Sequence, residues 1–428
     1  MASRLLRAGL IYTFANALAA GVPFLLLPIL TRALTPSDYG DVISFFLLSS
    51  LSTSVAGLSL HGAVSVKWFT RGDSDFPRFV ATAVAVVIAS TTLCGGLLLG
   101  LSQVLQASLH LPFHLWPAAA LFAGASVLVL MRTALWQSQG QALPAAVLQV
   151  AAATLNVGAS LVGVFLLDLG AEGRILGAVT ASLVSATVAV ASLRRSGDLR
   201  PALSSDDARA LLRFGVPLVP HALAGALLVS ADRLAVSSAL GAEALGVYGI
   251  AAQIGQVMNV LADAIVKAVT PWFYAQLKAP SARGRLRVVG MTLLLGPLWL
   301  VVAVVGWGCF TVLGPLILDA RYAAAIELSL WFLCGGAVAS SALNIAGLFF
   351  FTSKTEWLSV ATVTSALLAV GLSRTIVGHF GVAGGGAAFV LAQALQLGLS
   401  WGLSLRVFPM PWHRPLLAIR ILRRSMGR

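Results

Sequence analysis

Apolar runs of about 20 residues follow one another along almost the whole chain, separated by short polar segments. A run of that length lets an α-helix cross the hydrocarbon core of a bilayer, which is about 30 Å thick. Of the 428 residues, 58% are hydrophobic and only 10% are charged, so no segment remains for a soluble domain. The sequence therefore predicts an all-α polytopic membrane protein.

The runs predict twelve transmembrane helices joined by short connections. The first run exceeds the apolar core of a signal peptide, so we expect it to remain as the first helix. The longest connection, residues 194–213, is basic and has a helix-start pattern at Ser204, which predicts an amphipathic helix on the membrane surface or, alternatively, a solvated connector. The predicted spans are 9–31, 41–65, 79–101, 116–136, 145–167, 175–193, 214–239, 246–271, 288–311, 324–351, 357–377 and 384–406.

The basic residues are distributed unevenly between the two sides of the membrane. If the N-terminus is cytoplasmic, 22 of the 28 lysines and arginines fall on the inner side, and the outer helix ends hold Arg32, Arg174, Arg321 and Arg374. Positive residues favour the cytoplasmic side, so we expect both termini to lie in the cytoplasm. The net charge of +13 then indicates topology and contact with anionic membrane lipids, and not nucleic-acid binding.

Two stretches at the junctions of apolar runs align at a constant offset. They are TRALTPSDYGDV at Thr31–Val42 and SADRLAVSSALGAEALGVYGIAAQ at Ser230–Gln253. The alignment pairs Ala33 with Ala239, Leu34 with Leu240 and Gly40 with Gly246. A duplication is therefore predicted, with an N-terminal six-helix bundle at 1–193, a cytoplasmic amphipathic linker at 194–213, a C-terminal six-helix bundle at 214–406 and a basic cytoplasmic tail at 407–428.

Two pairs of ionisable residues lie inside the predicted spans of the second half, where their cost suggests a function. Asp232 and Arg233 are adjacent and point about 100° apart on a helix, so they cannot both face one cavity. Asp263 and Lys267 are one turn apart, and either they neutralise each other or Lys267 extends to the water interface. The last two continue a polar stripe that is made of Gln253, Gln256, Asn259, Asp263 and Lys267.

The sequence carries no pattern for metal, redox or catalytic chemistry. Cys94, Cys309 and Cys334 lie in apolar runs beside small residues, as packing groups do. A membrane enzyme such as a polysaccharide polymerase or ligase would need a large outer loop with catalytic groups, but the largest one, residues 102–115, has no acid or arginine. Without a nucleophile–base pair or a phosphate-binding loop, we expect a protein that is not an enzyme, does not hydrolyse ATP and uses no metal or cofactor.

Several stretches resemble one transporter family. They are PILTRALTPSDYG in the first half and FGVPLVPHALAGALLVSADRLAVSSALGAEALGVYGIAAQ, TPWFY and LGPLILDARYAAAIELSLWFL in the second. In order and spacing they resemble the oligosaccharide (O-antigen, Wzx-type) flippases of the polysaccharide-transport family, in the MOP superfamily with the MurJ-type flippases and the MATE-type exporters. This resemblance implies two six-helix bundles around a central cavity that opens alternately to each side. It also implies that undecaprenyl-pyrophosphate-linked oligosaccharide moves to the outer leaflet, and that other polysaccharide assembly proteins are partners.

Such a substrate needs cationic donors for its phosphates and hydroxyl or amide groups around its sugars. The candidate substrate-binding residues are Arg233, Arg32, Arg374, Lys267, Asn16, Gln256 and Asn259. Asp232 and Asp263 are the candidates for binding a coupling ion, either H⁺ or Na⁺. Because Lys267 is one turn from Asp263, we expect Asp232 to couple, unless it pairs statically with an arginine on another helix.

A MATE-like exporter of small cationic molecules is the alternative. It would share the fold but would rely on cavity acids and aromatic residues. Inside these spans Arg233 and Lys267 offset the two acids, which favours an anionic substrate.

Overall fold

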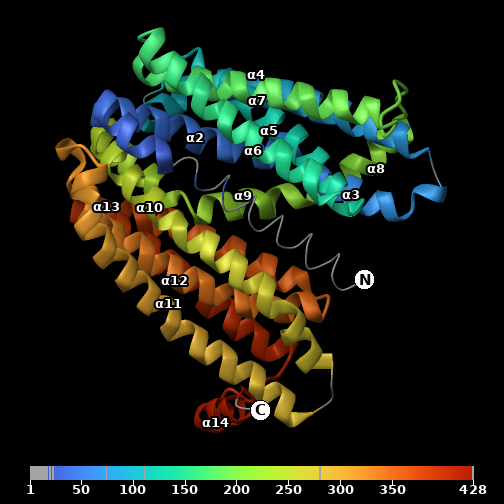
Figure 1. The fold of residues 1–428 in the computed structure, drawn as a ribbon, viewed down its shortest axis with the longest axis vertical. Helices are drawn as coiled ribbons and strands as arrows, with labels where there is room; N and C mark the ends of the chain where they lie inside the picture. The colour runs from blue at the N-terminus through green and yellow to red at the C-terminus, as the bar shows by residue number, and fades with distance from the viewer. Residues whose placement is uncertain are drawn as a thin grey trace. The chain divides into compact units, whose positions relative to one another are not determined.

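The computed structural model describes residues 24–73, 75–109, 111–278 and 281–426, together with Leu18 and Gly21. Within these ranges the regular structure is entirely helical, and ten helices are long and apolar enough to cross a membrane (Figure 1). The predicted all-α polytopic fold class is therefore confirmed. The chain divides into two compact units, the first formed by Met1–Ala226 with Leu240–Gly246 and the second by Leu227–Ala239 with Val247–Arg428.

The first unit contains the helices from α2 to most of α9. After an apolar helix at Phe24–Ala33 come α2 (Pro36–Gly57), α3 (Leu60–Phe69), η1 (Arg71–Asp73), α4 (Phe76–Leu109), α5 (Leu115–Ser138), α6 (Ala142–Leu161), η2 (Val162–Leu166), α7 (Gly170–Arg195), α8 (Ser205–Gly215), η3 (Val216–Leu218) and α9 (Val219–Leu228).

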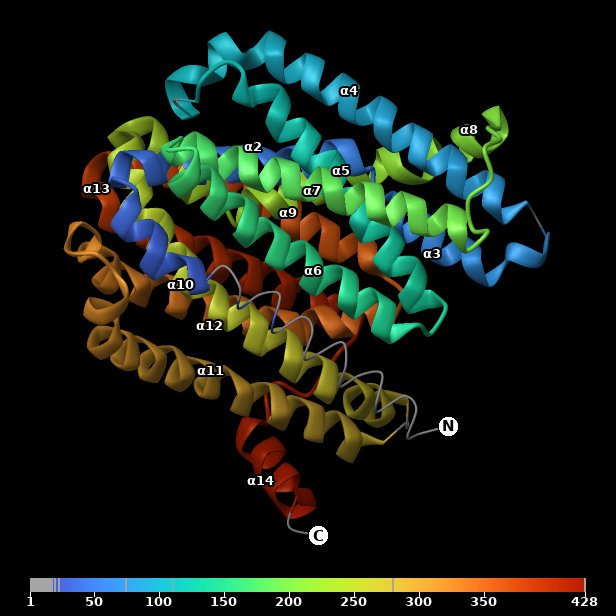
Figure 2. The same cartoon turned by 45° about the horizontal axis from the view of Figure 1, so that its top comes forward.

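Helix α5 is the centre of the first unit, because α2, α3, α4 and α7 all pack against it (Figure 2). Its buried face is rich in small residues such as Ala119, Ala123 and Gly124. Small residues let membrane helices approach closely, and the side chain of Thr91 on α4 fills the space at Gly124. The result is a closely packed first unit whose helix faces are fixed relative to one another.

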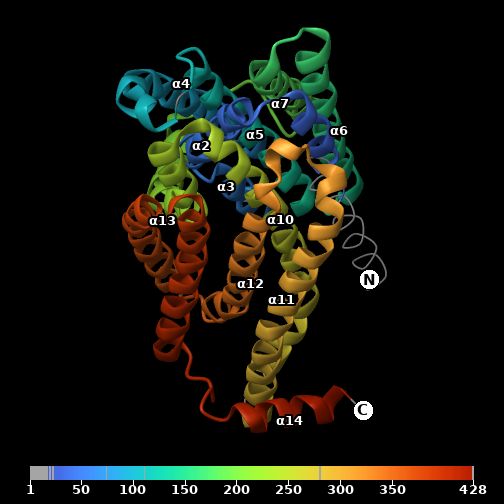
Figure 3. The same cartoon turned by 90° about the vertical axis from the view of Figure 1, so that its left-hand side faces the viewer.

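The second unit is built from four long helices, one short 3-10 turn and a terminal helix. They are α10 (Ala231–Lys278), α11 (Ala282–Ile317), η4 (Ala320–Tyr322), α12 (Ala324–Phe351), α13 (Thr355–Val407) and α14 (Pro415–Met426). Met258, Trp299 and Leu333 join α10, α11 and α12 in one buried apolar cluster. In the predicted tail, α14 lies across the first part of α11 (Figure 3), where Gly290 leaves room for the backbone at Ala418.

The helix boundaries refine the predicted spans. Helices α10 and α13 each contain one non-helical glycine, Gly241 with φ 83° and Gly381 with φ 62°, and each glycine lies at a predicted junction between two spans. The predicted span 41–65 was wrong as a single helix, because Leu58 and Ser59 take left-handed conformations and separate α2 from α3. Most of the first predicted span, 9–31, lies outside the described residues.

Two ion pairs hold the predicted connection, residues 194–213, against the first unit. A helix is present as predicted, since Ser204 caps α8 by accepting a hydrogen bond from the Asp207 backbone nitrogen. Arg78 on α4 donates to Asp207 at 3.0 Å. Before α8, the nearly buried Arg132 of α5 pairs with Asp198 at 3.0 Å. These two ion pairs fix residues 198–207 against α4 and α5.

Candidate functional site

Arg174, near the start of α7, is a buried cation of the first unit with 8% of its surface exposed. Its Nη1 donates to Asn156 Oδ1 at 3.2 Å and to Ser160 Oγ at 2.8 Å, and its guanidinium lies 5.0 Å from the centre of the Phe46 ring. Its Nε is buried without an acceptor, and no carboxylate pairs with it in the described part of the chain. Neutral groups compensate a buried charge only in part, so this site favours an anion.

The packing of α6 and η2 against α7 places Arg174. A Cβ added to Gly163 or to Gly173 would collide with the backbone of the other, and Gly177 meets the α6 backbone in the same way. Because these positions lack side chains, the helices touch backbone to backbone and Arg174 reaches its two acceptors on α6. The adjoining segment Val162–Leu166 is a π-helical turn, a feature that is frequent at functional sites.

A pocket of about 350 Å³ opens beside Arg174 between α2, α5, α6 and α7. This volume is at the lower end of the range for small-molecule sites. Phe46 and Phe122, with ring centres 5.6 Å apart, form an aromatic part of its wall. Its polar lining comes from Ser126, Asn156, Arg174, Ser182 and Ser185. Ser182 and Ser185 donate to carbonyls of their own helix, so the cation and the aromatic rings are what distinguish this lining.

The second unit has a smaller pocket, of about 40 Å³, around the half-buried Arg233. The guanidinium lies 6.0 Å from the centre of the Phe332 ring. The structure brings Gln256 and Asn259, two of the predicted substrate-binding residues, to this pocket together with Gln393, which the sequence did not single out. A volume of this size holds about one water molecule, so in this conformation the pocket is closed to a sugar.

Asp232 faces away from that pocket and is buried, with 2% of its surface exposed. Tyr248 donates its hydroxyl to Asp232 Oδ2 at 2.6 Å, while Oδ1 is buried without a partner in the described residues. The expectation that Asp232 and Arg233 face different directions is therefore confirmed. Among the described residues no arginine on another helix forms an ion pair with Asp232, so the static pairing considered from the sequence is not seen there.

The predicted polar stripe follows one face of α10. Asn259 Nδ2 donates to Gln256 Oε1 at 2.7 Å, and Lys267 Nζ pairs with Asp263 at 2.5 Å. Both members of the ion pair are about half exposed, with side-chain exposures of 54% and 55%. Of the two alternatives for Lys267, mutual neutralisation with Asp263 is the one observed. Asp263 is therefore already paired with a cation.

The remaining predicted residues lie elsewhere. Arg32 and Arg374 are exposed, and Arg374 does not line the pocket at Arg233. Asn16 lies outside the described residues. Two residues of the site were missed from the sequence, because Arg174 was assigned to an outer helix end and Tyr248 was read only as part of an apolar run. In the structure α7 begins at Gly170, five residues before the predicted start, which places Arg174 inside the helix.

Comparisons with known proteins agree with this architecture. A family model described as polysaccharide biosynthesis protein matches residues 5–276. An uncharacterised membrane protein of Haemophilus influenzae is 25% identical over 372 residues, covering 84% of this chain and 87% of that protein. A protein of the Lsg locus of the same organism is 28% identical over 264 residues, covering 60% of this chain and 63% of that protein.

The fold is shared with a solved transporter. The inward-facing form of a MATE family multidrug resistance transporter of the MOP superfamily aligns with a TM-score of 0.70 at 13% identity, and the alignment covers 96% of both chains. At that identity the likeness shows the fold.

Proposed function

We propose a flippase activity for this chain, which belongs to the polysaccharide biosynthesis protein family. Family membership and the MATE fold make it a multi-pass membrane transporter. We infer that it moves a polyprenyl-pyrophosphate-linked oligosaccharide from the inner to the outer leaflet of a bacterial inner membrane, for surface polysaccharide such as O-antigen. Alternating access would carry the substrate, and the charge distribution favours cytoplasmic termini.

The observation that supports this proposal is the buried, acid-free environment of Arg174. A guanidinium presents a planar set of donors that fits phosphate oxygens, and burial strengthens such a bond. The Nε that has no acceptor among the described residues is available for an incoming oxygen. A cationic drug would be repelled at this position, whereas a pyrophosphate would supply the charge that the site lacks.

A MATE-like exporter of small molecules is the second candidate. The shared fold and the buried carboxylate of Asp232 favour it. The absence of any carboxylate in the lining of the Arg174 pocket argues against a cationic cargo there.

Reconstituted vesicles distinguish the two candidates. We expect the full-length protein to make a sugar-labelled undecaprenyl-pyrophosphate oligosaccharide accessible in the opposite leaflet, and to leave an ethidium gradient unchanged. Ethidium transport without movement of the lipid-linked sugar would reject the flippase and establish the exporter.

Arg233 is proposed to hold the pyrophosphate at a later stage, with Arg32 and Arg374 contributing near the helix ends. Lysine cannot reproduce the bidentate bond of arginine, so Arg233→Lys should export at least about fivefold less glycan at equal protein level. The exposed linker residue Arg200 provides the matched control, and Arg200→Lys should export normally. Equal export by the two variants would leave Arg233 with a structural role only.

Asp232 is proposed to bind the coupling ion, either H⁺ or Na⁺. Neutralising its charge would favour one conformation through differential affinity of the ion for the two states. Asp232→Asn should insert normally, keep a hydrogen bond with Tyr248, and transport with little response to an imposed ion gradient. Tyr248→Phe is the companion variant, since it removes the donor and leaves the carboxylate. A full gradient response in Asp232→Asn vesicles would exclude Asp232 as the coupling site.

A further inference from the structure

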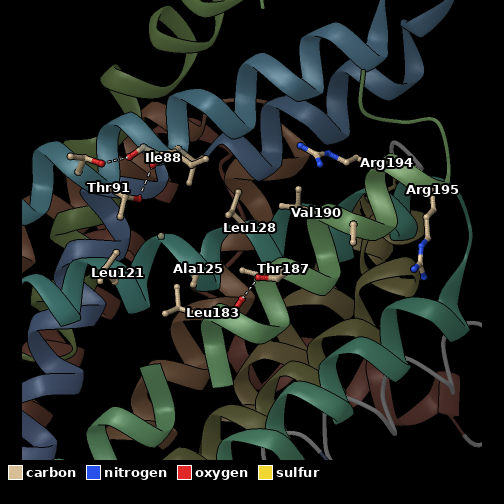
Figure 4. Close-up of a pocket in the computed structure, with 15 residues that line it drawn as sticks. Ile88, Thr91, Leu121, Ala125, Leu128, Leu183, Thr187, Val190, Arg194 and Arg195 are labelled. Carbon is tan, nitrogen blue, oxygen red and sulfur yellow. Dashed lines mark hydrogen bonds between the residues drawn. The ribbon is translucent and has the colours of Figure 1, made fainter. Parts of the chain in front are cut away.

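A second, larger groove of about 590 Å³ runs along the first unit between α4, α5 and α7 (Figure 4). It is separate from the Arg174 pocket, because α5 and α7 line it with different faces. Large apolar side chains stand exposed along it, including Ile88 at 55%, Leu121 at 48% and Leu183 at 42%. The groove therefore presents an open hydrocarbon-like surface on the helices.

The hydroxyls in the groove are already used. Thr91 donates to the Val87 carbonyl at 2.7 Å, Thr92 to Ile88 at 3.0 Å and Thr187 to Leu183 at 2.8 Å, each within its own helix. Their donors are therefore not available to a ligand, and a sugar or a peptide would find few partners along these walls. An apolar chain needs none, so the walls favour hydrocarbon.

Two arginines at the end of α7, Arg194 and Arg195, close the groove at one end. Their side chains leave the helix in different directions (Figure 4) and both are exposed. Neither forms an ion pair within the described ranges. The nearest acid in the sequence, Asp198, is already held by Arg132 and accepts from Gln139 and Ser196. In the described part of the chain, the two positive charges thus have no carboxylate paired with them.

The length of the groove matches one leaflet of a bilayer. From Leu183 to Arg195 the helix rises about 18 Å, at about 1.5 Å per residue. Half of a hydrocarbon core about 30 Å thick is about 15 Å. A lipid with its phosphate at the arginines would therefore place an acyl chain along the whole groove. An undecaprenyl chain is longer than one leaflet is deep and fits this length less well.

We propose that this groove binds an anionic phospholipid, with the head-group phosphate at Arg194 and Arg195 and one acyl chain between α4, α5 and α7. Basic pockets between helices at the cytoplasmic side of a membrane bind anionic head groups in this way. By the positive-inside rule this end is cytoplasmic, so the lipid comes from the inner leaflet. Because α7 leads directly into residues 196–204 and α8, the bound lipid anchors the start of the connection to the membrane surface. This site is independent of the transported substrate.

The test measures lipid binding to the purified full-length protein by native mass spectrometry, with phosphatidylglycerol and phosphatidylcholine of identical chains. We expect phosphatidylglycerol to bind more tightly. Each of Arg194→Gln and Arg195→Gln should weaken it about fivefold, and the double variant about 30-fold. Phosphatidylcholine binding should hardly change in these variants, and Arg200→Gln, nearby in the same connection, should bind both lipids normally.

A second variant tests the chain-binding part. Ile88→Trp fills the groove from an exposed position, so it should weaken both lipids while gel filtration and thermal unfolding stay as in the parent. Unchanged lipid binding in Ile88→Trp, or equal losses in Arg200→Gln, would overturn the proposal. If inorganic phosphate at matched concentration displaced phosphatidylglycerol, the two arginines would form a site for free phosphate and not for a lipid. Preferential binding of undecaprenyl phosphate would assign the groove to a polyprenyl chain instead.

Discussion

Arg174→Met should lower glycan export by about 10- to 100-fold, the range expected when one charge-assisted hydrogen bond to a phosphate is lost. Methionine keeps the apolar contact with the Phe46 ring and removes the charge. The arginine is buried with neutral partners and no paired carboxylate among the described residues, so removing its charge relieves a desolvation cost that offsets the two lost hydrogen bonds. We therefore expect the melting temperature of Arg174→Met to be equal to or above that of the parent.

The combination of lost export with retained stability is what identifies a binding residue. Arg174→Lys keeps the charge but cannot reach both acceptors on α6 and a phosphate at once, so its export should fall between those of the parent and Arg174→Met. Arg132 is the comparison, because it is buried with a carboxylate partner, and Arg132→Met should lose about 3–5 kcal/mol of stability. If Arg174→Met is destabilised as strongly as Arg132→Met, Arg174 has a structural role.

Periodicity and length were enough to predict most of the fold. Most of the apolar runs in the described residues are helical, and the junctions at Gly241 and Gly381 fell where two runs met, although the runs 41–65 and 214–239 are each broken into two helices. The break at Leu58 and Ser59 was not predictable in the same way. Both residues take left-handed conformations that neither favours, so packing of α2 and α3 around them, and not local propensity, sets the bend.

The candidate site was predictable only in part. The spacing of Gln256 and Asn259 along α10 placed them correctly on one face with their hydrogen bond. The burial of Arg174 could not be predicted from the residues around it in the sequence. Its burial results from contacts between glycines on η2 and α7, and one turn of difference in the start of α7 separates a surface residue from a buried cation.

The two glycines that the sequence alignment pairs lie together in the first unit. The segment Leu240–Gly246 packs there, although unit 2 precedes and follows it in the chain. Gly40 and Gly246, the glycines paired by the alignment, meet in this contact. A Cβ built on Gly246 would lie 2.9 Å from the Gly40 backbone nitrogen and would run into the Pro36 carbonyl oxygen. A Cβ on Gly40 would run into the Ala242 carbonyl oxygen.

Alanine at either glycine should therefore force the start of α2 and the segment Leu240–Gly246 apart. The obstructing atoms are backbone and cannot rotate away, so each of Gly40→Ala and Gly246→Ala should cost about 3 kcal/mol, the upper end for overpacking. Once one methyl has separated the segments, the second meets less resistance, so the double variant should lose clearly less than the sum of the two. Gly371→Ala is the matched control, since nothing lies within 4 Å of an added Cβ in α13 and alanine favours a helix there. Thermal unfolding of the four variants tests whether the two glycines form one shared contact. Additive losses of stability in the double variant, or losses no larger than that of Gly371→Ala, would mean that they do not.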